Sequence, residues 1–174
     1  QLEMESNGKS VALDGAPLEL ESSPIVWGGV GTDAQHAVFQ LLHQGSHLVP
    51  VEFLAVIEPG DSLSPAHHNG LLLNCFAQGA ALMAGKKSDD SHRNYQGDRP
   101  SVTILLEDLE ACSLGALLAF YEHRTFVNAV LLNINPFDQF GVELGKQMAN
   151  KLAAEDGNRL DASTEELKRR AFGA

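Results

Sequence analysis

The chain of 174 residues carries a net charge of −11, and 44% of its residues are hydrophobic. This length suits one domain with a sizeable buried core, and the apolar content argues against disorder throughout. The negative charge argues against general nucleic-acid binding, which needs basic patches. A few well-placed cations and backbone N–H groups could still capture one phosphate.

The cysteines and the hydropathy pattern indicate the compartment. Cys75 and Cys112 stand in apolar surroundings without metal-type spacing, which predicts reduced, buried thiols in a cytoplasmic protein. No apolar run reaches the roughly 20 residues that a membrane span requires, and no signal peptide is expected. The chain starts at Gln1 without an initiating Met, so we expect a fragment of a longer protein.

The first segment, residues 1–9, contains turn chemistry at Ser6-Asn7-Gly8, since Asn and Gly tolerate a positive φ. Glu5 is therefore expected at the edge of a turn, where an isolated carboxylate is most often simply solvated. Residues 10–13 are predicted to form a short strand that ends in a turn at Asp14-Gly15.

A second apolar run, residues 24–27, leads through glycines at 28–31 into a predicted helix with Thr32 or Asp33 as its N-cap. The residues expected to face inward are Ala37, Val38, Leu41 and Leu42. A strand, a glycine turn and a helix form the building unit of a parallel α/β sheet. The glycines do not fit the G-x-G-x-x-G spacing, so no nucleotide cofactor is expected.

Histidines on this chain do not form a convincing metal site. His36 and His43 are seven residues apart on the predicted helix and so lie on nearly the same face. No cysteine or carboxylate joins them at ligand spacing, and such histidines are most often surface or capping residues. His67 and His68 point about 100° apart on a helix, which makes chelation of one ion difficult.

The middle of the chain is predicted to alternate between strands and helices. Strands are expected at 49–57 and, buried, at 101–106; helices at 65–84 and 113–125; and a polar loop at 86–99. The expected core stripe of the first of these helices is Leu72, Cys75, Phe76, Gly79 and Leu82. At least three strand-then-helix units result, and the predicted class is α/β with a parallel sheet between helices.

The most apolar run, residues 129–132, is predicted to be extended and to end at Pro136. A helix should then open with Gln139 in its first turn and Lys146 about two turns further in. Its expected buried stripe is Phe140, Leu144, Met148 and Leu152. Free N–H groups at such a helix start favour anions, although an ordinary amphipathic helix with a solvated lysine explains the spacing equally well.

The last segment, residues 155–174, is expected to be a tail with a polar break and a final helix. Ser163 and Glu166 have the spacing of a capping box, and basic residues close the helix, where they complement its dipole.

Three blocks of this sequence resemble the glucose-6-phosphate isomerase family. Residues 137–146 (Phe-Asp-Gln-Phe-Gly-Val-Glu-Leu-Gly-Lys) are similar to a signature of the family, and residues 4–9 (Met-Glu-Ser-Asn-Gly-Lys) to its block with the catalytic base. Residues 27–37 with 40–45 are similar to its central block. The resemblance implies an α/β three-layer sandwich of the sugar-isomerase (SIS) type with a C-terminal helix. Residues 1–174 would be the C-terminal domain of a longer enzyme.

The resemblance also implies roles for five residues. Glu5 would be the catalytic base, and His36 and Lys146 would open the sugar ring. Gln1 and Gln139 would contact the substrate. In that family the histidine acts in the active site of the neighbouring subunit, which implies a homodimer with His36 supplied across the interface.

Some positions carry residues that differ from those common in the family, and one family motif limits the role of an arginine. Gly29 stands where glutamate is frequent and Asp33-Ala34 where Asn-Gly is frequent, but none of these is the implied acid or base. Residues 97–100 (Gly-Asp-Arg-Pro) are similar to a family motif that gives Arg99 a structural role and not that of a phosphate clamp.

The implied reaction interconverts glucose 6-phosphate and fructose 6-phosphate through an enediol, as in glycolysis and gluconeogenesis. It needs ring opening, a carboxylate that moves a proton between C2 and C1, and donors for the phosphate, but no metal or redox cofactor. The family's main phosphate loops lie upstream, so the fragment alone is expected to be weak or inactive. The alternatives are a non-catalytic sugar-phosphate-binding module of the same fold and an isomerase for another sugar phosphate, such as a mannose derivative.

Overall fold

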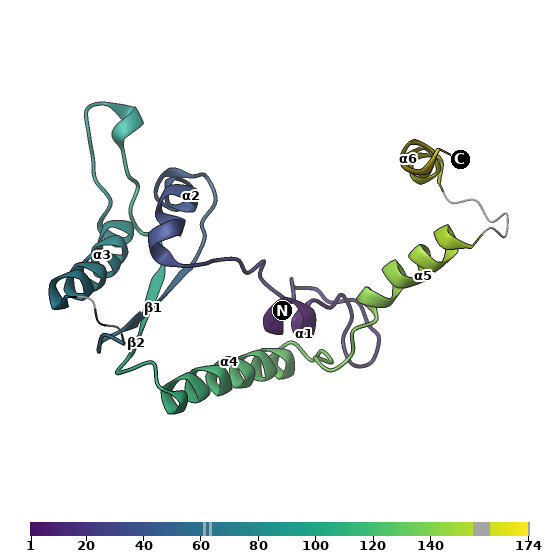
Figure 1. Cartoon of the computed structure of the whole chain (residues 1–174), viewed down its shortest axis with the longest axis horizontal. Coiled ribbons are helices and arrows are strands. Elements are labelled where there is room, and N and C mark those ends of the chain that lie inside the picture. Colours follow the sequence, from purple (N-terminus) through teal and green to yellow (C-terminus); the bar gives the residue numbers. More distant parts are fainter. Residues whose placement is uncertain (61, 63, 155–160, 174) are drawn as a thin grey trace. The chain divides into compact units, whose positions relative to one another are not determined.

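The computed structural model describes residues 1–60, 62, 64–154 and 161–173 (Figure 1). The chain divides into two compact units. The central unit comprises Ile25–Arg124, and the terminal unit comprises Gln1–Pro24 together with Thr125–Ala174.

The central unit contains a parallel pair of strands. Strand β1, Val51–Val56, pairs with β2, Ser101–Leu106, in a register that runs from Val51 opposite Ser101 to Val56 opposite Leu106. Parallel strands need a crossover connection, and helix α3 supplies it here (Figure 1). Both predicted strands and the α/β class are confirmed.

The predicted burial of β2 is wrong for this chain. Val102 and Leu105 are 59% and 50% exposed. Parallel strands are buried when helices cover both faces of the sheet, and the described residues provide too little cover for these two side chains.

Helix α3 spans Pro65–Ala84, as predicted. Ser64 is its N-cap in an extended conformation, and Pro65 occupies the first helical position, where a missing N–H costs nothing. Leu82 is 1% exposed, but Phe76, predicted to belong to the same inward stripe, is 42% exposed. Gly85 ends the helix with a φ of +60°, and a Cβ there would lie 2.5 Å from the Tyr95 main-chain oxygen.

The loop between α3 and β2 contains one turn of 3-10 helix, η1, at Ser91–Arg93. An isolated antiparallel bridge between Lys86 and Tyr95 closes the base of this loop. The predicted polar loop at 86–99 is thus confirmed, with a short helical turn at its tip.

Helix α2 spans Gly31–Gln44 and begins before either of the predicted caps. Its N-cap is Val30, which is extended and makes no side-chain cap hydrogen bond, so the prediction of Thr32 or Asp33 is wrong. Val38 and Leu42 face inward as expected, whereas Ala37 and Leu41 are exposed. A narrower stripe is buried because α2 packs mainly against α3 within the unit.

Two of the predicted short strands do not form. Residues 24–27 join no ladder in the described part of the chain, and residues 10–13 make only one antiparallel bridge, between Val11 and Pro17. The predicted turn after it is confirmed: the Gly15 N–H donates to the Ala12 oxygen at 2.9 Å, and Gly15 has a φ of +84°. A short apolar run becomes a strand only when a neighbouring strand pairs with it.

The first segment is a helix, α1, at Leu2–Asn7, and not the predicted turn. Glu5 therefore lies within an element. Gly8 caps the helix with a φ of −73°, so the positive φ on which the turn prediction depended does not occur there. A side chain on Gly8 would collide with the Met4 main-chain oxygen, which explains why glycine follows this helix.

Helix α4 spans Ala111–Leu131 and is longer than predicted at both ends. Residues 129–131, which were predicted to be extended, therefore belong to the last turn of this helix. His123 lies in the interior of the helix. The Ile134 N–H donates to the Ala129 oxygen at 3.0 Å and closes the helix end. A short apolar run fits a buried strand and a buried helix equally well, so periodicity alone could not separate the two.

Two further helices complete the terminal unit: α5 at Gly141–Ala153 and α6 at Ala162–Phe172. Gln139 precedes α5 instead of lying in its first turn. The predicted stripe on α5 is only half-buried at Met148 and Leu152, while Phe140 and Leu144 are 70% and 57% exposed.

The predicted capping box of α6 is wrong. Asp161 is the N-cap and accepts the Thr164 N–H at 3.0 Å. Glu166 pairs with Arg169 and Arg170 at the other end of the helix. The first part of the predicted tail, 155–160, lies outside the described residues.

Both cysteines are free, as predicted, but only Cys75 is partly buried; Cys112 is exposed. The helices of the described residues are all too short or too polar to cross a membrane.

Candidate functional site

The predicted site residues are divided between the two units. Gln1, Glu5, Gln139 and Lys146 belong to the terminal unit, and His36 belongs to the central unit.

Gln1 and Glu5 lie one turn apart at the start of α1. The Gln1 side-chain amide donates to the Glu5 carboxylate, with 3.4 Å between Nε2 and Oε2, and the Glu5 N–H donates to the Gln1 oxygen at 3.0 Å. Residues four apart share a helix face, so the two side chains predicted to meet the substrate are placed together. Glu5 is half-buried and Gln1 is exposed.

The other face of α1 is anchored. Buried Asn7 donates through Nδ2 to the Thr125 oxygen at 3.0 Å and to Glu3 at 3.1 Å, and the Thr125 hydroxyl donates to Glu3 at 3.1 Å. Positions 3 and 7 share a helix face, whereas position 5 points nearly the opposite way. Anchoring through Glu3 and Asn7 therefore leaves the Glu5 carboxylate on the unanchored face.

Lys9, which the sequence alone did not single out as a site residue, follows Gly8, the residue that caps α1. Its ammonium donates to the Glu5 and Ser6 oxygens at 2.9 and 2.7 Å and lies 3.6 Å from a carboxylate oxygen of Asp138. The cation thus joins the end of α1 to the loop that carries Gln139. A lysine just after a helix can bind the last carbonyl oxygens of that helix. The sequence predicted a turn here and not a helix, so this role of Lys9 was not recognised.

Gln139 lies in the loop before α5, and Lys146 lies on α5 itself. The Gln139 oxygen accepts the Val142 N–H at 3.1 Å and so begins the helix. Lys146 is exposed and lies about one and a half turns after the start of α5. It forms no hydrogen bond or ion pair with the residues that the structure describes. Its ammonium is therefore available to an anion or a hydroxyl group.

His36 lies exposed on α2 and lines a cavity of about 610 Å³ in the central unit. His43, further along the same helix, lines this cavity as well and contacts Gln78 of α3, with 3.0 Å between Nε2 and Oε1. Tyr95 packs edge-on against the His43 ring at a centroid distance of 6.1 Å.

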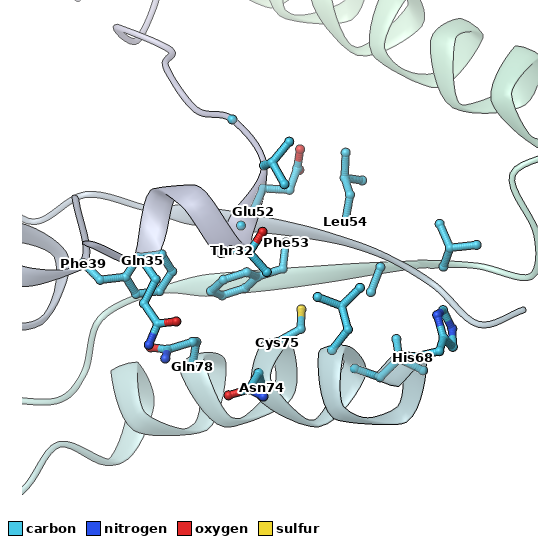
Figure 2. Close-up of a pocket in the computed structure, with 17 residues that line it drawn as sticks. Thr32, Gln35, Phe39, Glu52, Phe53, Leu54, His68, Asn74, Cys75 and Gln78 are labelled. Carbon is cyan, nitrogen blue, oxygen red and sulfur yellow. The ribbon is translucent and has the colours of Figure 1, made fainter. Parts of the chain in front are cut away.

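A second cavity of the central unit, about 550 Å³, lies between the start of α2, strand β1 and α3 (Figure 2). Phe53, Phe39 and Cys75 give it a mainly apolar lining, and Gln35 and Gln78 add polar groups at one end (Figure 2). Burial raises the pKa of the Cys75 thiol, so the reactive thiolate is disfavoured. Cys75 therefore has a packing role in this cavity.

Glu52 also lines this cavity, but it is engaged elsewhere. The Tyr121 hydroxyl donates to one carboxylate oxygen, and Arg124 donates to the other at 2.9 Å. Desolvation, together with the Glu52 contact, raises the pKa of Tyr121 to about 12. The carboxylate is a structural link between β1 and α4.

Arg99 has the structural role that the sequence predicted. It is 6% exposed, and its guanidinium donates to the His47 oxygen at 2.7 Å and to the Gly45 oxygen at 2.6 Å. These bonds fix the chain where it leaves α2. Main-chain oxygens therefore engage the two terminal nitrogens, and the buried group cannot serve as an open phosphate ligand.

Comparison with known proteins identifies the family. A family model described as phosphoglucose isomerase matches residues 1–167. The glucose-6-phosphate isomerase of Novosphingobium aromaticivorans is 68% identical over 96% of this chain, and that of Sphingopyxis alaskensis 67% over 99%. The chain spans only 33% and 34% of the length of these relatives.

Solved structures support the same assignment. A glucose-6-phosphate isomerase from Chlamydia trachomatis has a TM-score of 0.86 and 36% identity over 99% of this chain and 34% of its own. A hypothetical protein from Thermus thermophilus, 22% identical with a TM-score of 0.61 over 88% of this chain and 36% of its own, shares the fold. The predicted sugar-isomerase type of α/β fold is consistent with these likenesses. By sequence and by structure, the chain belongs to the phosphoglucose isomerase family.

Proposed function

We propose that this chain is the C-terminal domain, residues 1–174, of a longer cytoplasmic enzyme that interconverts glucose 6-phosphate and fructose 6-phosphate. Family membership supports this reaction, which belongs to glycolysis and gluconeogenesis. The observation that carries the proposal is the placement of Glu5. Its carboxylate is half-buried, lies beside the Gln1 amide, and occupies the face of α1 that the Asn7 and Glu3 contacts leave open.

In this proposal, Glu5 removes the proton from C2 of the open-chain aldose. The electron pair forms the C1–C2 double bond while the C1 carbonyl oxygen takes up a proton, which gives an enediol. The same carboxyl group then returns its proton to C1, the hydroxyl group on C2 loses its proton, and the new C2 carbonyl completes the ketose. Aldose and ketose are isomers, so the reaction balances without an oxidant, a reductant or a metal. Gln1 and Gln139 contact the substrate and keep C1 and C2 beside the base.

Ring opening is assigned to His36 and Lys146. One group protonates the ring oxygen while the other takes the proton of the neighbouring hydroxyl group. Lys146 is exposed and unpaired among the described residues, which suits this role. His36 is exposed on α2, as a residue that acts in the neighbouring subunit of a homodimer must be.

The 174-residue chain by itself should be weak or inactive. It spans about a third of the length of its relatives, and part of the substrate-binding groups would come from the remaining portion. Robust turnover by the purified 174-residue chain would contradict this part of the proposal.

The decisive experiment compares the full-length protein with its Glu5→Gln variant. The substitution keeps the size and the hydrogen bonding of the side chain but removes the base. We expect isomerase turnover to fall by about three orders of magnitude or more, within the range that such groups supply, while calorimetry still detects binding of glucose 6-phosphate.

Glu19→Gln is the matched control, since Glu19 is exposed in the same unit and has no proposed role. Unchanged turnover in Glu5→Gln would overturn the assignment of the base. A full-length wild type that binds sugar phosphates without turnover would favour the non-catalytic binding module. Turnover of mannose 6-phosphate at a higher rate would favour the related isomerase.

A further inference from the structure

The ammonium of Lys9 has three N–H donors, and three oxygens surround it. Two are the main-chain oxygens of Glu5 and Ser6, at 2.9 and 2.7 Å, and the third belongs to the Asp138 carboxylate, at 3.6 Å. Two of its donors bind main-chain oxygens and its charge is paired with Asp138, so Lys9 is poorly suited to bind a substrate phosphate. Its contacts indicate a different role.

The backbone around Lys9 is held in place as well. The Ser22 hydroxyl accepts the Lys9 N–H at 3.1 Å and donates to the Lys9 oxygen at 2.6 Å. Both main-chain polar groups of Lys9 are thus bound by one side chain. The side chain can therefore fold back over the end of α1 from a fixed starting point.

The two segments that Lys9 joins both carry proposed site residues. One is the last turn of α1, whose Glu5 supplies both the proposed base and one of the oxygens that Lys9 binds. The other is the loop before α5, in which Gln139 directly follows Asp138. A displacement of the cation would change the position of either segment.

The Lys9–Asp138 contact is shielded from solvent. The side chains of Lys9 and Asp138 are 14% and 25% exposed. Salt and water screen such a pair less than they screen an exposed surface ion pair. The pair can therefore hold the loop beside α1 under physiological conditions.

We propose that Lys9 is a positioning residue: it holds the Glu5 helix and the Gln139 loop in one geometry through its contacts with the α1 carbonyl oxygens and Asp138. This inference rests on the proposed isomerase function. Proton transfer between C2 and C1 requires one carboxylate to reach both carbons, and small misplacements of a reacting group are costly. Removal of the cation should therefore misplace the base without removing it.

The position of the base can be read from the fate of the transferred hydrogen. With glucose 6-phosphate that carries deuterium at C2, a well-placed carboxyl group returns part of the label to C1, and the rest is lost to water. A displaced or more exposed carboxyl group holds the label less efficiently. The fraction retained at C1 of fructose 6-phosphate therefore reports the placement of Glu5, whereas a smaller amount of folded enzyme leaves this fraction unchanged.

The experiment uses the full-length protein with Lys9→Met, Lys9→Arg and Asp138→Asn. Lys9→Met keeps an unbranched stem without the charge, and we expect kcat to fall about tenfold or more, with less label retained at C1. Lys9→Arg keeps the charge and the donors and should restore part of both values. Asp138→Asn leaves the α1 carbonyl contacts intact, so it should raise KM through the Gln139 loop and leave label retention near the wild-type value.

Lys151→Met is the matched control, because Lys151 is exposed on α5 of the same unit. An active wild type whose Lys9→Met variant keeps the wild-type kcat and label retention would overturn the positioning role alone. Equal loss of label retention in Asp138→Asn and Lys9→Met would also overturn it as stated, since the two contacts would not act separately. If Lys9→Met does not fold, Lys9→Arg and Asp138→Asn still test the split between label retention and KM. An inactive wild type would refute the isomerase proposal on which the inference rests.

Discussion

Asn7 and Thr125 are 118 residues apart in the sequence, and the Asn7 side-chain amide donates to the Thr125 main-chain oxygen at 3.0 Å. Asn7 is fully buried, and the Thr125 hydroxyl in turn donates to Glu3. These contacts attach α1 to the C-terminal part of α4. They determine which face of α1 is in contact with α4, and Glu5 lies on the opposite face.

Substitution of Asn7 by Ala should therefore destabilise the protein. The change removes the two hydrogen bonds of a buried side chain, which together contribute about 1–3 kcal/mol at about 0.5–1.5 kcal/mol each. The midpoint of thermal unfolding should fall accordingly. Asn150→Ala, at an exposed position of α5, is the control and should leave the midpoint unchanged or slightly higher. Equal midpoints for Asn7→Ala and the wild type would contradict the anchoring role.

Arg99 should prove necessary for stability and unnecessary for phosphate binding. Arg99→Met leaves the Gly45 and His47 oxygens without their charged donor, which costs about 1.5–3 kcal/mol for a hydrogen bond to a charged group. Chemical denaturation measures this loss. Calorimetry at a temperature where the variant is folded should find the wild-type affinity for glucose 6-phosphate. Arg93→Met, whose side chain is 80% exposed, should change neither property.

Gly85 and Gly115 should respond to alanine in opposite directions. At Gly85, φ is +60° and a Cβ would lie 2.5 Å from the Gly97 nitrogen, so Gly85→Ala must shift the backbone and should cost about 1–3 kcal/mol. Gly115 lies inside α4, and a Cβ added there would meet no atom of the described residues within 4 Å, its own helix backbone aside. Alanine at this position should therefore stabilise the helix by about 0.5–1 kcal/mol. Unfolding midpoints of the two variants test this contrast, which equal shifts would contradict.

Because of Tyr121, the stability of the folded protein should decrease at alkaline pH. Its pKa is raised to about 12 in the folded protein, whereas the unfolded value is the ordinary one of 10.0. The unfolded chain loses the phenol proton first as pH rises, so this contribution is fully present below about pH 10 and is lost between about pH 10 and pH 12. The difference in ultraviolet absorbance between the wild type and Tyr121→Phe follows the titration.

Glu52→Gln tests the physical cause of that shift. The substitution removes the negative charge beside the phenol, and the pKa of Tyr121 should move back toward its ordinary value. Glu122→Gln, an exposed carboxylate next to Tyr121 in the sequence, is the control. An unchanged titration in Glu52→Gln would leave desolvation, the largest cause, as the sole explanation.

Local chemistry made several elements of the central unit predictable. Pro65 after Ser64 marked the start of α3, and the β-branched run at 101–106 marked β2. These signals depend on the conformational preferences of neighbouring residues, which act whatever the rest of the protein does. The family resemblance, carried by whole blocks of sequence, was likewise readable without a structure.

The segment around Glu5 shows where such reasoning failed. Ser6-Asn7-Gly8 has the composition of a turn, but Asn7 is buried and its amide nitrogen donates to Glu3 and to Thr125. A contact between residues so far apart in sequence overrides a local preference, because buried N–H groups must find acceptors. The apolar run at 129–132 failed for a related reason, since burial alone does not distinguish a strand from a helix.

The sequence by itself determined the family, the α/β class and the identity of the candidate residues Gln1, Glu5, His36, Gln139 and Lys146. Only the tertiary structure decided how Glu5 is presented and that Lys9 joins its helix to Asp138. The physical reason is that residue types and spacing along the chain determine local conformation. Hydrogen bonds and ion pairs between distant segments depend on how the chain folds back on itself, and one sequence read in order does not display them.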